Sequence, residues 1–321
     1  MCVFAQELAL QRILPRGEIE SLDHTRIVRV RLPERASVYA ARAARLRQLA
    51  EDSPVADYLR LMALVADAQH ALLADCQVPG ADAGRIELAQ VHGMPPLQAI
   101  GWQRHPLWTG LLRRLCQHVE AADGVPEEAV EVCRALRHGL DEQVEAIEDM
   151  ADALLQERDA DVDSAAAPFV MATLQVYWTD LASRFDTAQL PVVSPFGVCP
   201  VCGSLPVASV VRVGGQVDGY RYLCCSLCAT EWHMVRVTCS HCQDTQKVAY
   251  QSIEGGSEAI KAESCDACHT YRKIFYQEKD LYVEPVADDL ASLMLDVLMG
   301  EAGYSRSSGN PLLWHGADEE E

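Results

Sequence analysis

The sequence lacks several features that would by themselves assign a function. Its longest apolar stretch, around residues 165–178, contains Thr173 and Gln175 and falls short of the roughly 20 residues that a membrane-spanning helix needs. No region is rich in basic residues: 18 Lys and Arg accompany 29 Asp and Glu through residue 190, and 9 accompany 18 afterwards. Duplex nucleic acid requires a clustered basic surface. We therefore expect neither membrane insertion nor nucleic acid binding.

The N-terminus also lacks the pattern of a secretory signal, because Glu7, Arg12 and Arg16 interrupt its apolar residues. We predict a soluble, cytoplasmic protein in a reducing compartment. Thirteen cysteines would suggest disulfides in a small secreted chain, but in a large cytoplasmic chain CxxC pairs are more often metal ligands.

The first 190 residues predict a helical domain. Apolar residues recur at helical spacing, and serine or proline marks several helix starts. Helices are predicted over 37–50, after Ser53-Pro54, after Pro106, over 126–157, and over 166–185, the last being the most apolar and therefore the most buried. Short connections between such helices indicate a bundle. No residues in this half have catalytic spacing, so we expect a protein that is not an enzyme.

The composition changes near Pro191, where turn residues, β-branched residues and cysteine pairs begin. Short strands are predicted from there to about residue 282. We divide the chain into a helical domain (1–190), a first metal ribbon (191–238), a second metal ribbon (239–283), and a C-terminal helix and tail (284–321). The predicted fold class is α+β and multidomain, with two tandem rubredoxin-like or zinc-ribbon β units after the helical bundle.

The ribbons form an internal repeat. Each contains two CxxC pairs with 22 residues between the inner cysteines, and adding 40 to each cysteine number of the first unit gives the second. The predicted metal ligands are Cys199, Cys202, Cys225 and Cys228 in the first unit, and Cys239, Cys242, Cys265 and Cys268 in the second.

The CxxC spacing has a geometric reason. Two intervening residues allow a tight turn that directs both sulfurs at one ion, and two such turns complete a tetrahedral set of four sulfurs. Zinc or iron suits four thiolates, and the spacing does not separate them. A closed site of this kind leaves no position for a substrate. A structural zinc site contributes on the order of 10–16 kcal/mol, so each ribbon is expected to fold only with its metal.

Two alternatives concern the cysteines. In the first alternative, Cys225 and Cys228 share a site with Cys239 and Cys242, but the outer two pairs are then left without partners. In the second, the cysteines are redox dithiols without metal, but such dithiols would not require a duplicated spacing. Cys224 adjoins Cys225, and the repeat places Ser264 at the matching position, so Cys224 is interpreted as a spare thiol. The remaining cysteines are interpreted as small buried hydrophobic residues (Cys76, Cys116, Cys133) or as incidental (Cys2).

Two further features have competing interpretations. Three histidines lie in or near the ribbons, and because four thiolates already saturate each ion, they are interpreted as surface residues or neighbours of the ligands (His233, His241, His269). The segment 93–108, GMPPLQAIGWQRHPLW, is rich in proline and aromatic residues. It is predicted to be a packed connection between helices, with a partner-docking loop as the alternative.

Several stretches resemble the formate dehydrogenase accessory protein family, FdhE. The C-terminal ones are CPVCGS (199–204), GYRYLCCSLCATEWHMVRVTCSHC (219–242), AESCDACHTYRKIFYQEKD (262–280) and VADDLASLMLDVLMGEAGYSRSSGNP (286–311). The N-terminal ones are ARLRQLAEDSPVADYLRLMAL (44–64), GMPPL (93–97) and APFVMATLQVYW (167–178). The resemblance covers most of the chain, and all eight predicted ligand cysteines are present.

The resemblance implies a cytoplasmic assembly factor that a respiratory formate dehydrogenase needs for activity. It implies a partner, the molybdenum- and selenocysteine-containing catalytic subunit, which the factor binds before export, and rubredoxin-like ribbons associated with iron. The alternative function is a rubredoxin-type one-electron carrier acting on the formate dehydrogenase. A nucleic-acid-binding zinc ribbon is disfavoured, because residues 199–280 hold 8 basic and 9 acidic residues. The sequence leaves homo-oligomer formation open.

Overall fold

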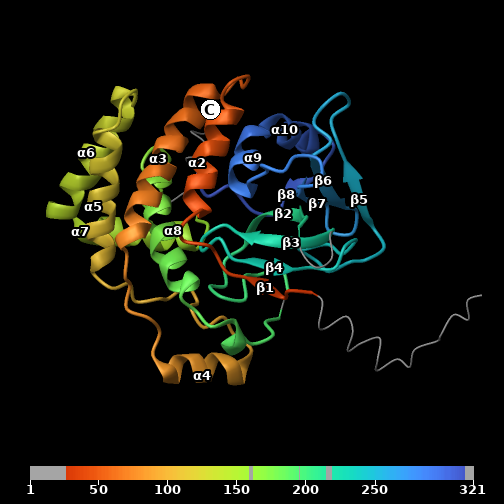
Figure 1. The fold of residues 1–321 in the computed structure, drawn as a ribbon, viewed down its shortest axis with the longest axis horizontal. Coiled ribbons are helices and arrows are strands. Elements are labelled where there is room, and N and C mark those ends of the chain that lie inside the picture. The colour runs from red at the N-terminus through yellow and green to blue at the C-terminus, as the bar shows by residue number, and fades with distance from the viewer. Residues whose placement is uncertain (1–26, 159–161, 195, 215–218, 315–321) are drawn as a thin grey trace, which may run out of the picture.

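The protein has a helical half and a sheet half, which lie side by side in Figure 1. The structure is a computed structural model, and it describes residues 27–158, 162–194, 196–214 and 219–314. The helices of the first half are α2 (Val38–Leu49), α3 (Ala56–Asp75), α4 (Ala83–His92), α5 (Leu107–Glu120), α6 (Glu127–Glu142), α7 (Val144–Leu155) and α8 (Ala167–Ser183), followed by the short 3-10 helix η2 (Thr187–Gln189). No helix in these ranges is both long and apolar enough to cross a bilayer.

Helix α8 is the centre of the helical half, as its apolar sequence predicts. Every residue from Ala167 to Ala182 is buried, because α3, α5 and α7 pack around it and the sheet half covers its remaining side. Its few polar groups are satisfied locally or by neighbours. The Thr173 hydroxyl donates to the Phe169 carbonyl at 2.9 Å, and Thr179 shares a 2.8 Å hydrogen bond with Tyr39. Polar side chains inside α8 are therefore compatible with complete burial.

The helix predicted over 126–157 is two helices, α6 and α7. Gln143 separates them with φ −141° and ψ 46°, outside the helical region. The break lets the chain fold back so that Ile147 packs on Gly139, where a Cβ atom would lie 3.3 Å from Ile147 Cδ1. Apolar periodicity alone does not indicate such a break, because both helices place apolar residues toward the same core.

The sheet half contains one continuous sheet. Its strands are β1 (Val30–Arg31), β2 (Pro206–Arg212), β3 (Tyr220–Cys225), β4 (Glu231–His233), β5 (Val248–Gln251), β6 (Ile260–Cys265), β7 (Thr270–Tyr276) and β8 (Ser305–Arg306). The order is β1-β4-β3-β2-β7-β6-β5, with β8 also paired to β7. Strands β2–β4 belong to the first repeat unit and β5–β7 to the second.

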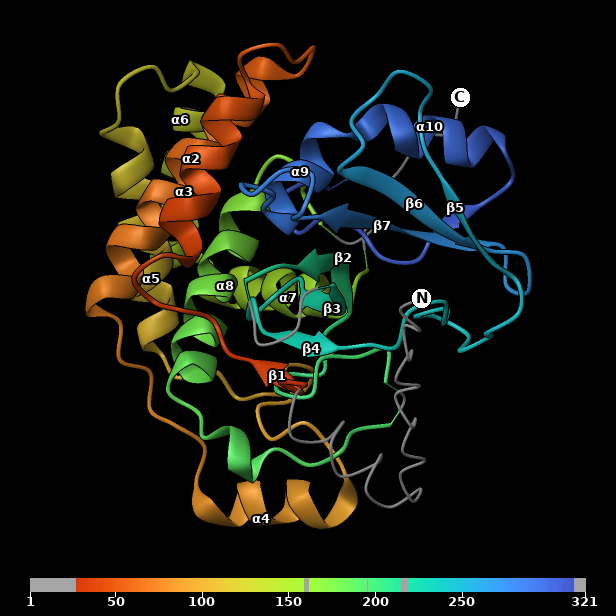
Figure 2. The ribbon, with the colours of Figure 1, turned by 45° about the vertical axis from the view of Figure 1, so that its right-hand side comes forward.

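The repeat is visible in the strands as well as in the cysteines. Strand β3 and strand β6 cover positions that differ by 40 at both ends, and each is the middle strand of its antiparallel unit. The units join through β2 and β7, which pair in parallel with Val210 opposite Phe275. Figure 2 shows the resulting sheet extending from β1 to β5. The two units thus share one sheet.

The C-terminal segment returns to helix, as predicted, but in two pieces. Helix α9 (Pro285–Ala291) and helix α10 (Leu293–Glu301) are separated at Ser292, whose φ is −109° and ψ 36°. Helix α9 packs against both α2 and β2, so it lies between the helical half and the sheet (Figure 1). Helix α10 buries Leu295 and Met299 against Ala262 and Tyr271 of the second unit.

Candidate metal centres

The first group of cysteines lies where the sheet meets the helical half. Cys199 and Cys202 occupy the turn before β2, Cys225 ends β3, and Cys228 lies in the turn between β3 and β4. The sulfur of Cys199 is 3.6 Å from that of Cys228, and the sulfur of Cys202 is 3.4 Å from that of Cys225. All four side chains are buried. The four sulfurs therefore surround one point in the interior.

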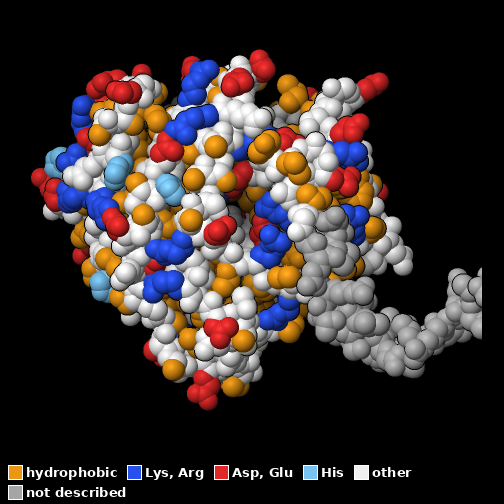
Figure 3. Space-filling view, in the orientation of Figure 1, with side chains coloured by type: hydrophobic (Ala, Val, Ile, Leu, Met, Phe, Trp, Pro, Cys, Tyr) orange, Lys and Arg blue, Asp and Glu red, His pale blue; other side chains and the backbone are white. Residues whose placement is uncertain are grey.

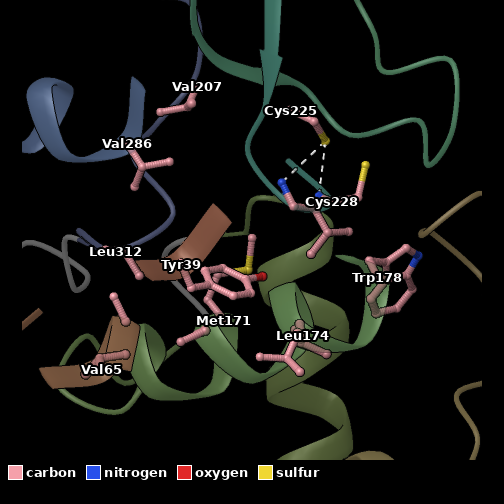
Figure 4. Packing of buried hydrophobic residues seen from close by; sticks show 14 of the residues in the cluster. Tyr39, Val65, Met171, Leu174, Trp178, Val207, Cys225, Cys228, Val286 and Leu312 are labelled. Carbon is pink, nitrogen blue, oxygen red and sulfur yellow. Dashed lines mark hydrogen bonds between the residues drawn. The ribbon is translucent and has the colours of Figure 1, made fainter. Parts of the chain in front are cut away.

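The turns around this group direct backbone N–H groups at sulfur. The N–H groups of Leu227 and Cys228 each lie 3.4 Å from Cys225 Sγ (Figure 4). Hydroxyl groups approach the other sulfurs: Cys228 Sγ is 3.1 Å from the Thr230 hydroxyl, and Cys202 Sγ is 3.5 Å from the Ser204 hydroxyl. The thiols of Cys228 and Cys202 donate to these hydroxyls, whereas the backbone N–H donors stabilise thiolate and orient it toward a metal.

The second group repeats this arrangement 40 residues later. Cys239 Sγ is 3.8 Å from Cys268 Sγ, and Cys242 Sγ is 3.6 Å from Cys265 Sγ. The N–H groups of His241 and Cys242 approach Cys239 Sγ at 3.4 and 3.5 Å, and Cys268 Sγ is 3.1 Å from the Thr270 hydroxyl. Cys239 and Cys265 are buried, Cys268 is half-buried, and Cys242 is exposed. The second group is thus more open than the first.

All four CxxC turns end in a residue with left-handed backbone. The φ angles are +77° at Gly203, +56° at Ala229, +67° at Gln243 and +54° at His269. The glycine at 203 fits this conformation without strain, whereas each of the other three residues adopts it at a cost of roughly 1–2 kcal/mol. The same left-handed turn residue therefore occurs at all four positions, although only the first of them is glycine.

The thiols within each group do not ionise independently. Burial raises the pKa of Cys199 and of Cys225 well above the ordinary thiol value. Burial also opposes ionisation of Cys202, but hydrogen bonds from the other three thiols outweigh it and hold the pKa of Cys202 well below that value. In the second group, the Thr270 hydroxyl lowers the pKa of Cys268 to about 7 against the effect of burial.

These observations fit a soft divalent cation in each group. The four sulfurs of each group all lie within 4.8 Å of one another. Four cysteine sulfurs are the ligand set of a zinc or single-iron site. A metal binds cysteine as the thiolate, so binding displaces the thiol protons and supplies the positive charge that four thiolates need. The structure gathers the eight cysteines into these two groups, and their ligation of metal stays a prediction.

The helical half holds the first group through the segment 93–108. The N–H groups of Leu97 and Ala99 donate to the carbonyls of Val201 and Cys202, both at 2.9 Å. From α8, the side chain of Gln175 donates to the Ser226 carbonyl at 2.7 Å. Both turns of the first group are therefore hydrogen-bonded to the helical domain. Sequence reasoning missed these contacts, although the GMPPL motif at 93–97 marks one of them.

The same segment connects α4 and α5, and part of it is packed, whereas Met94 and Ile100 are exposed. Trp108 is completely buried, and the Trp178 indole donates to the Leu97 carbonyl at 3.1 Å. Trp102 donates to the Tyr177 hydroxyl at 3.3 Å. Figure 4 shows Trp178, Tyr39, Cys225 and Cys228 in one hydrophobic cluster around α8.

The other candidate residues lie outside both groups. Cys224 is buried but is not among the clustered sulfurs, and Cys76, Cys116 and Cys133 are buried in the hydrophobic core. His233 packs edge-on against Tyr220 and Tyr222, and its burial lowers its pKa. His241 and His269 are exposed, next to cysteines of the second group. Cys2 lies outside the described residues.

Family models match almost the whole described chain. Residues 27–194 match the FdhE N-terminal model, residues 198–236 the FdhE central domain, and residues 237–313 the FdhE C-terminal domain. The chain belongs to the FdhE family. The resemblance stated from sequence is therefore confirmed, as is the fold class of a helical region followed by a sheet-rich region with two four-cysteine clusters.

Individual relatives show the same similarity. The chain is 42% identical to Protein FdhE of Escherichia coli K12 over 312 residues, covering 96% of this chain and 99% of the relative. The FdhE homolog of Cronobacter sakazakii has the same identity and coverage. The crystal structure of the FdhE protein from Pseudomonas aeruginosa matches with a TM-score of 0.77 and 35% identity, over 90% of this chain and 100% of that one.

Proposed function

We propose that this chain is an accessory protein required for an active respiratory formate dehydrogenase. In this proposal it binds the molybdenum- and selenocysteine-containing catalytic subunit in the cytoplasm before export, and it is not itself an enzyme. The observation that carries the proposal is membership of the FdhE family over nearly the whole chain, together with two complete four-cysteine groups. Each group would hold one iron or zinc ion, coordinated only by protein sulfur.

The chemistry of the site supports a role without catalysis. Four sulfurs around one point complete a tetrahedral shell, so neither group offers an open position for a substrate or an activated water. The metal would supply folding free energy and, if it is iron, a one-electron redox couple. The CxxC turns would orient the thiolates through backbone N–H contacts, and the cysteines of the first group are buried.

Complementation tests this proposal. The full chain is expressed in a bacterium whose own FdhE gene is deleted, and formate dehydrogenase activity is measured in membranes. We expect the wild-type chain to restore activity and Cys199→Ala to fail, whereas the matched non-ligand variant Cys224→Ser should restore it. Absence of restoration by a well-expressed, metal-loaded wild-type chain would contradict the proposal.

A second candidate function is a rubredoxin-type electron carrier acting on the formate dehydrogenase. One observation favours it: Cys242 is exposed, so an iron ion in the second group would lie near the surface. This function requires a visible thiolate-to-iron absorption band that bleaches reversibly on reduction. A colourless, zinc-loaded chain that still restores formate dehydrogenase activity would exclude it.

A further inference from the structure

The two cysteine groups share a sequence pattern but differ in their surroundings. In the first group no cysteine side chain is more than 2% exposed. In the second, Cys239 and Cys265 are buried, but Cys268 is half-buried and Cys242 is exposed. Neighbouring turn residues His241, Gln243 and His269 are exposed as well. One side of the second group therefore faces solvent.

The helical domain closes the first group. Backbone N–H groups of Leu97 and Ala99 hold its first turn, and the Gln175 side chain on buried α8 holds its second turn. Gly203 at the end of the first turn leaves space for Gln98, whose side-chain oxygen would lie 2.5 Å from a Cβ atom at that position. The helical domain therefore covers both turns of the first group, and of its four cysteines Cys225 lines a cavity of about 570 Å³ at the junction with α2.

The buried side of the second group carries positive charge. Arg272 is 4% exposed, and its guanidinium donates to the Ser240 hydroxyl at 2.9 Å, to the Ser308 hydroxyl at 2.6 Å and to the Pro206 carbonyl. Among the described residues, no carboxylate forms an ion pair with it. Arg272 and the ligand cysteines Cys239 and Cys265 line the same small cavity, of about 10 Å³.

Neighbouring charges act on Arg272 in both directions: Arg221 and Arg306 repel its charge, whereas Glu263 and Glu157 attract it. Arg221 and Glu263 form an ion pair with each other and are both buried, so the three side chains together carry one positive charge. A buried charge without a counter-charge is strongly unfavourable. Four thiolates around a divalent metal carry two negative charges, and Cys239 and Cys265 line the same cavity as Arg272, so this complex would add negative charge beside Arg272. The repeat has no equivalent in the first unit, where the residue 40 positions earlier is Trp232.

We propose that the two sites have different roles. The second site exchanges its metal: it is open to solvent at Cys242, and the positive charge of Arg272 on its buried side balances the negative charge of the metal–thiolate complex. The first site is enclosed and links the helical domain to the ribbon. This inference rests on the metal-binding part of the proposed function. Exchange at the second site proceeds by replacement of thiolates, beginning with Cys242, by ligand atoms from solution, and each released thiolate takes up a proton. The first site keeps its metal until the domains separate.

The test measures metal release from the isolated full chain loaded with zinc under anaerobic conditions. An excess of the chromogenic chelator 4-(2-pyridylazo)resorcinol is added, and the absorbance of its zinc complex is followed. We expect one equivalent per chain to be released quickly and the other more than about tenfold more slowly, because the first site must open the domain interface. Release of both equivalents at one rate would overturn the proposal.

Variants assign the phases. Cys242→Ser should remove the fast equivalent and leave the slow one, and the non-ligand control Cys224→Ser should keep both. Arg272→Gln should accelerate the fast phase, whereas Arg272→Lys, which keeps the charge, should not. Loss of the slow phase in Cys242→Ser, or no difference between the two Arg272 variants, would contradict the assignment.

Labelling of the wild-type chain gives a result that does not depend on how the variants fold. Brief treatment of the zinc-loaded protein with iodoacetamide, followed by peptide mass spectrometry, should modify Cys242 before any cysteine of the first group. Earlier modification of Cys199 or Cys202 would overturn the proposal. These experiments contain no formate dehydrogenase, so a negative result in them does not contradict the accessory function. Equally, a negative complementation result does not contradict the difference between the two metal sites.

Discussion

The guanidinium of Arg45 on α2 binds the carboxylate of Asp288 on α9 through two hydrogen bonds, of 2.9 and 2.6 Å. Asp288 is completely buried and Arg45 is 6% exposed, so the pair is shielded from water. A second arginine of α2, Arg42, binds Glu284 at the start of α9 at 3.1 Å. Helix α2 thereby fixes the C-terminal segment, which packs in turn on β2.

Removing one partner of this pair should destabilise the fold strongly. Asp288→Ala leaves the buried Arg45 guanidinium with Asp280 as its remaining carboxylate partner, and breaking a buried ion pair costs about 3–5 kcal/mol. We expect a loss at the lower end of that range in the free energy of unfolding, measured by urea denaturation. The matched control is Arg47→Ala, which removes the exposed pair between α2 and Asp67 and should cost about 1 kcal/mol or less. Equal effects of the two variants would contradict this account of the interface.

Single cysteine substitutions should each remove one metal ion, with different structural consequences. Cys199→Ala and Cys239→Ala are both expected to lower the metal content from two to one per chain, measured by elemental analysis of purified protein. Because the first group is hydrogen-bonded to the helical domain, Cys199→Ala should also expose the domain junction to limited proteolysis, whereas Cys239→Ala should loosen mainly the second ribbon. Cys224→Ser should retain both metals. Two metals per chain in either alanine variant would refute the ligand assignment.

Acid should destabilise the protein partly through Asp289. Burial disfavours its charge, but the nearby Lys273 and Arg306 outweigh burial and hold the pKa of Asp289 below its usual value. A carboxyl group with a lowered folded-state pKa contributes stability above its unfolded pKa, and this contribution is lost as the pH falls through the folded pKa. The unfolding free energy of the wild type should therefore fall below about pH 4, and the difference from Asp289→Asn should shrink there. A difference that is constant with pH would exclude this contribution.

The left-handed turn residues allow a stabilising substitution. Gln243 is exposed and has φ +67°, so Gln243→Gly should raise the unfolding free energy by about 0.5–1 kcal/mol by removing backbone strain. Gly203→Ala is the converse change at the equivalent turn of the first group and should destabilise, because its Cβ would collide with Gln98 as well. Thermal unfolding of the metal-loaded variants measures both. Destabilisation by Gln243→Gly would contradict this prediction, because it would show that the Gln243 side chain stabilises the fold by more than the backbone strain destabilises it.

Local chemistry made much of this structure predictable from sequence. The spacing of the cysteines identified the repeat, and the apolar stretch around residues 165–178 identified the central helix, which was predicted over 166–185. Both signals are local, because a CxxC turn and a buried helix each depend on neighbouring residues. The domain boundaries drawn from composition stay a prediction.

Long-range pairing was not predictable in the same way. Strands β2 and β7 pair across more than 60 residues and unite the two ribbons, yet neither strand carries a residue type that specifies its partner. The contacts of Leu97, Ala99 and Gln175 with the first cysteine group use backbone groups and an amide, which have no sequence signature. The difference in exposure between the two groups follows from these contacts and could not be read from identical spacings.

Co-purification with a formate dehydrogenase catalytic subunit is the decisive test of the proposed accessory role. The tagged chain is purified without oxygen from cells that produce a molybdenum- and selenocysteine-containing formate dehydrogenase, and the same eluate is analysed for protein partners and for metal. We expect the catalytic subunit to co-elute and the chain to carry two iron or zinc ions. A folded chain that elutes without the catalytic subunit, although the subunit is present in the lysate, would contradict it.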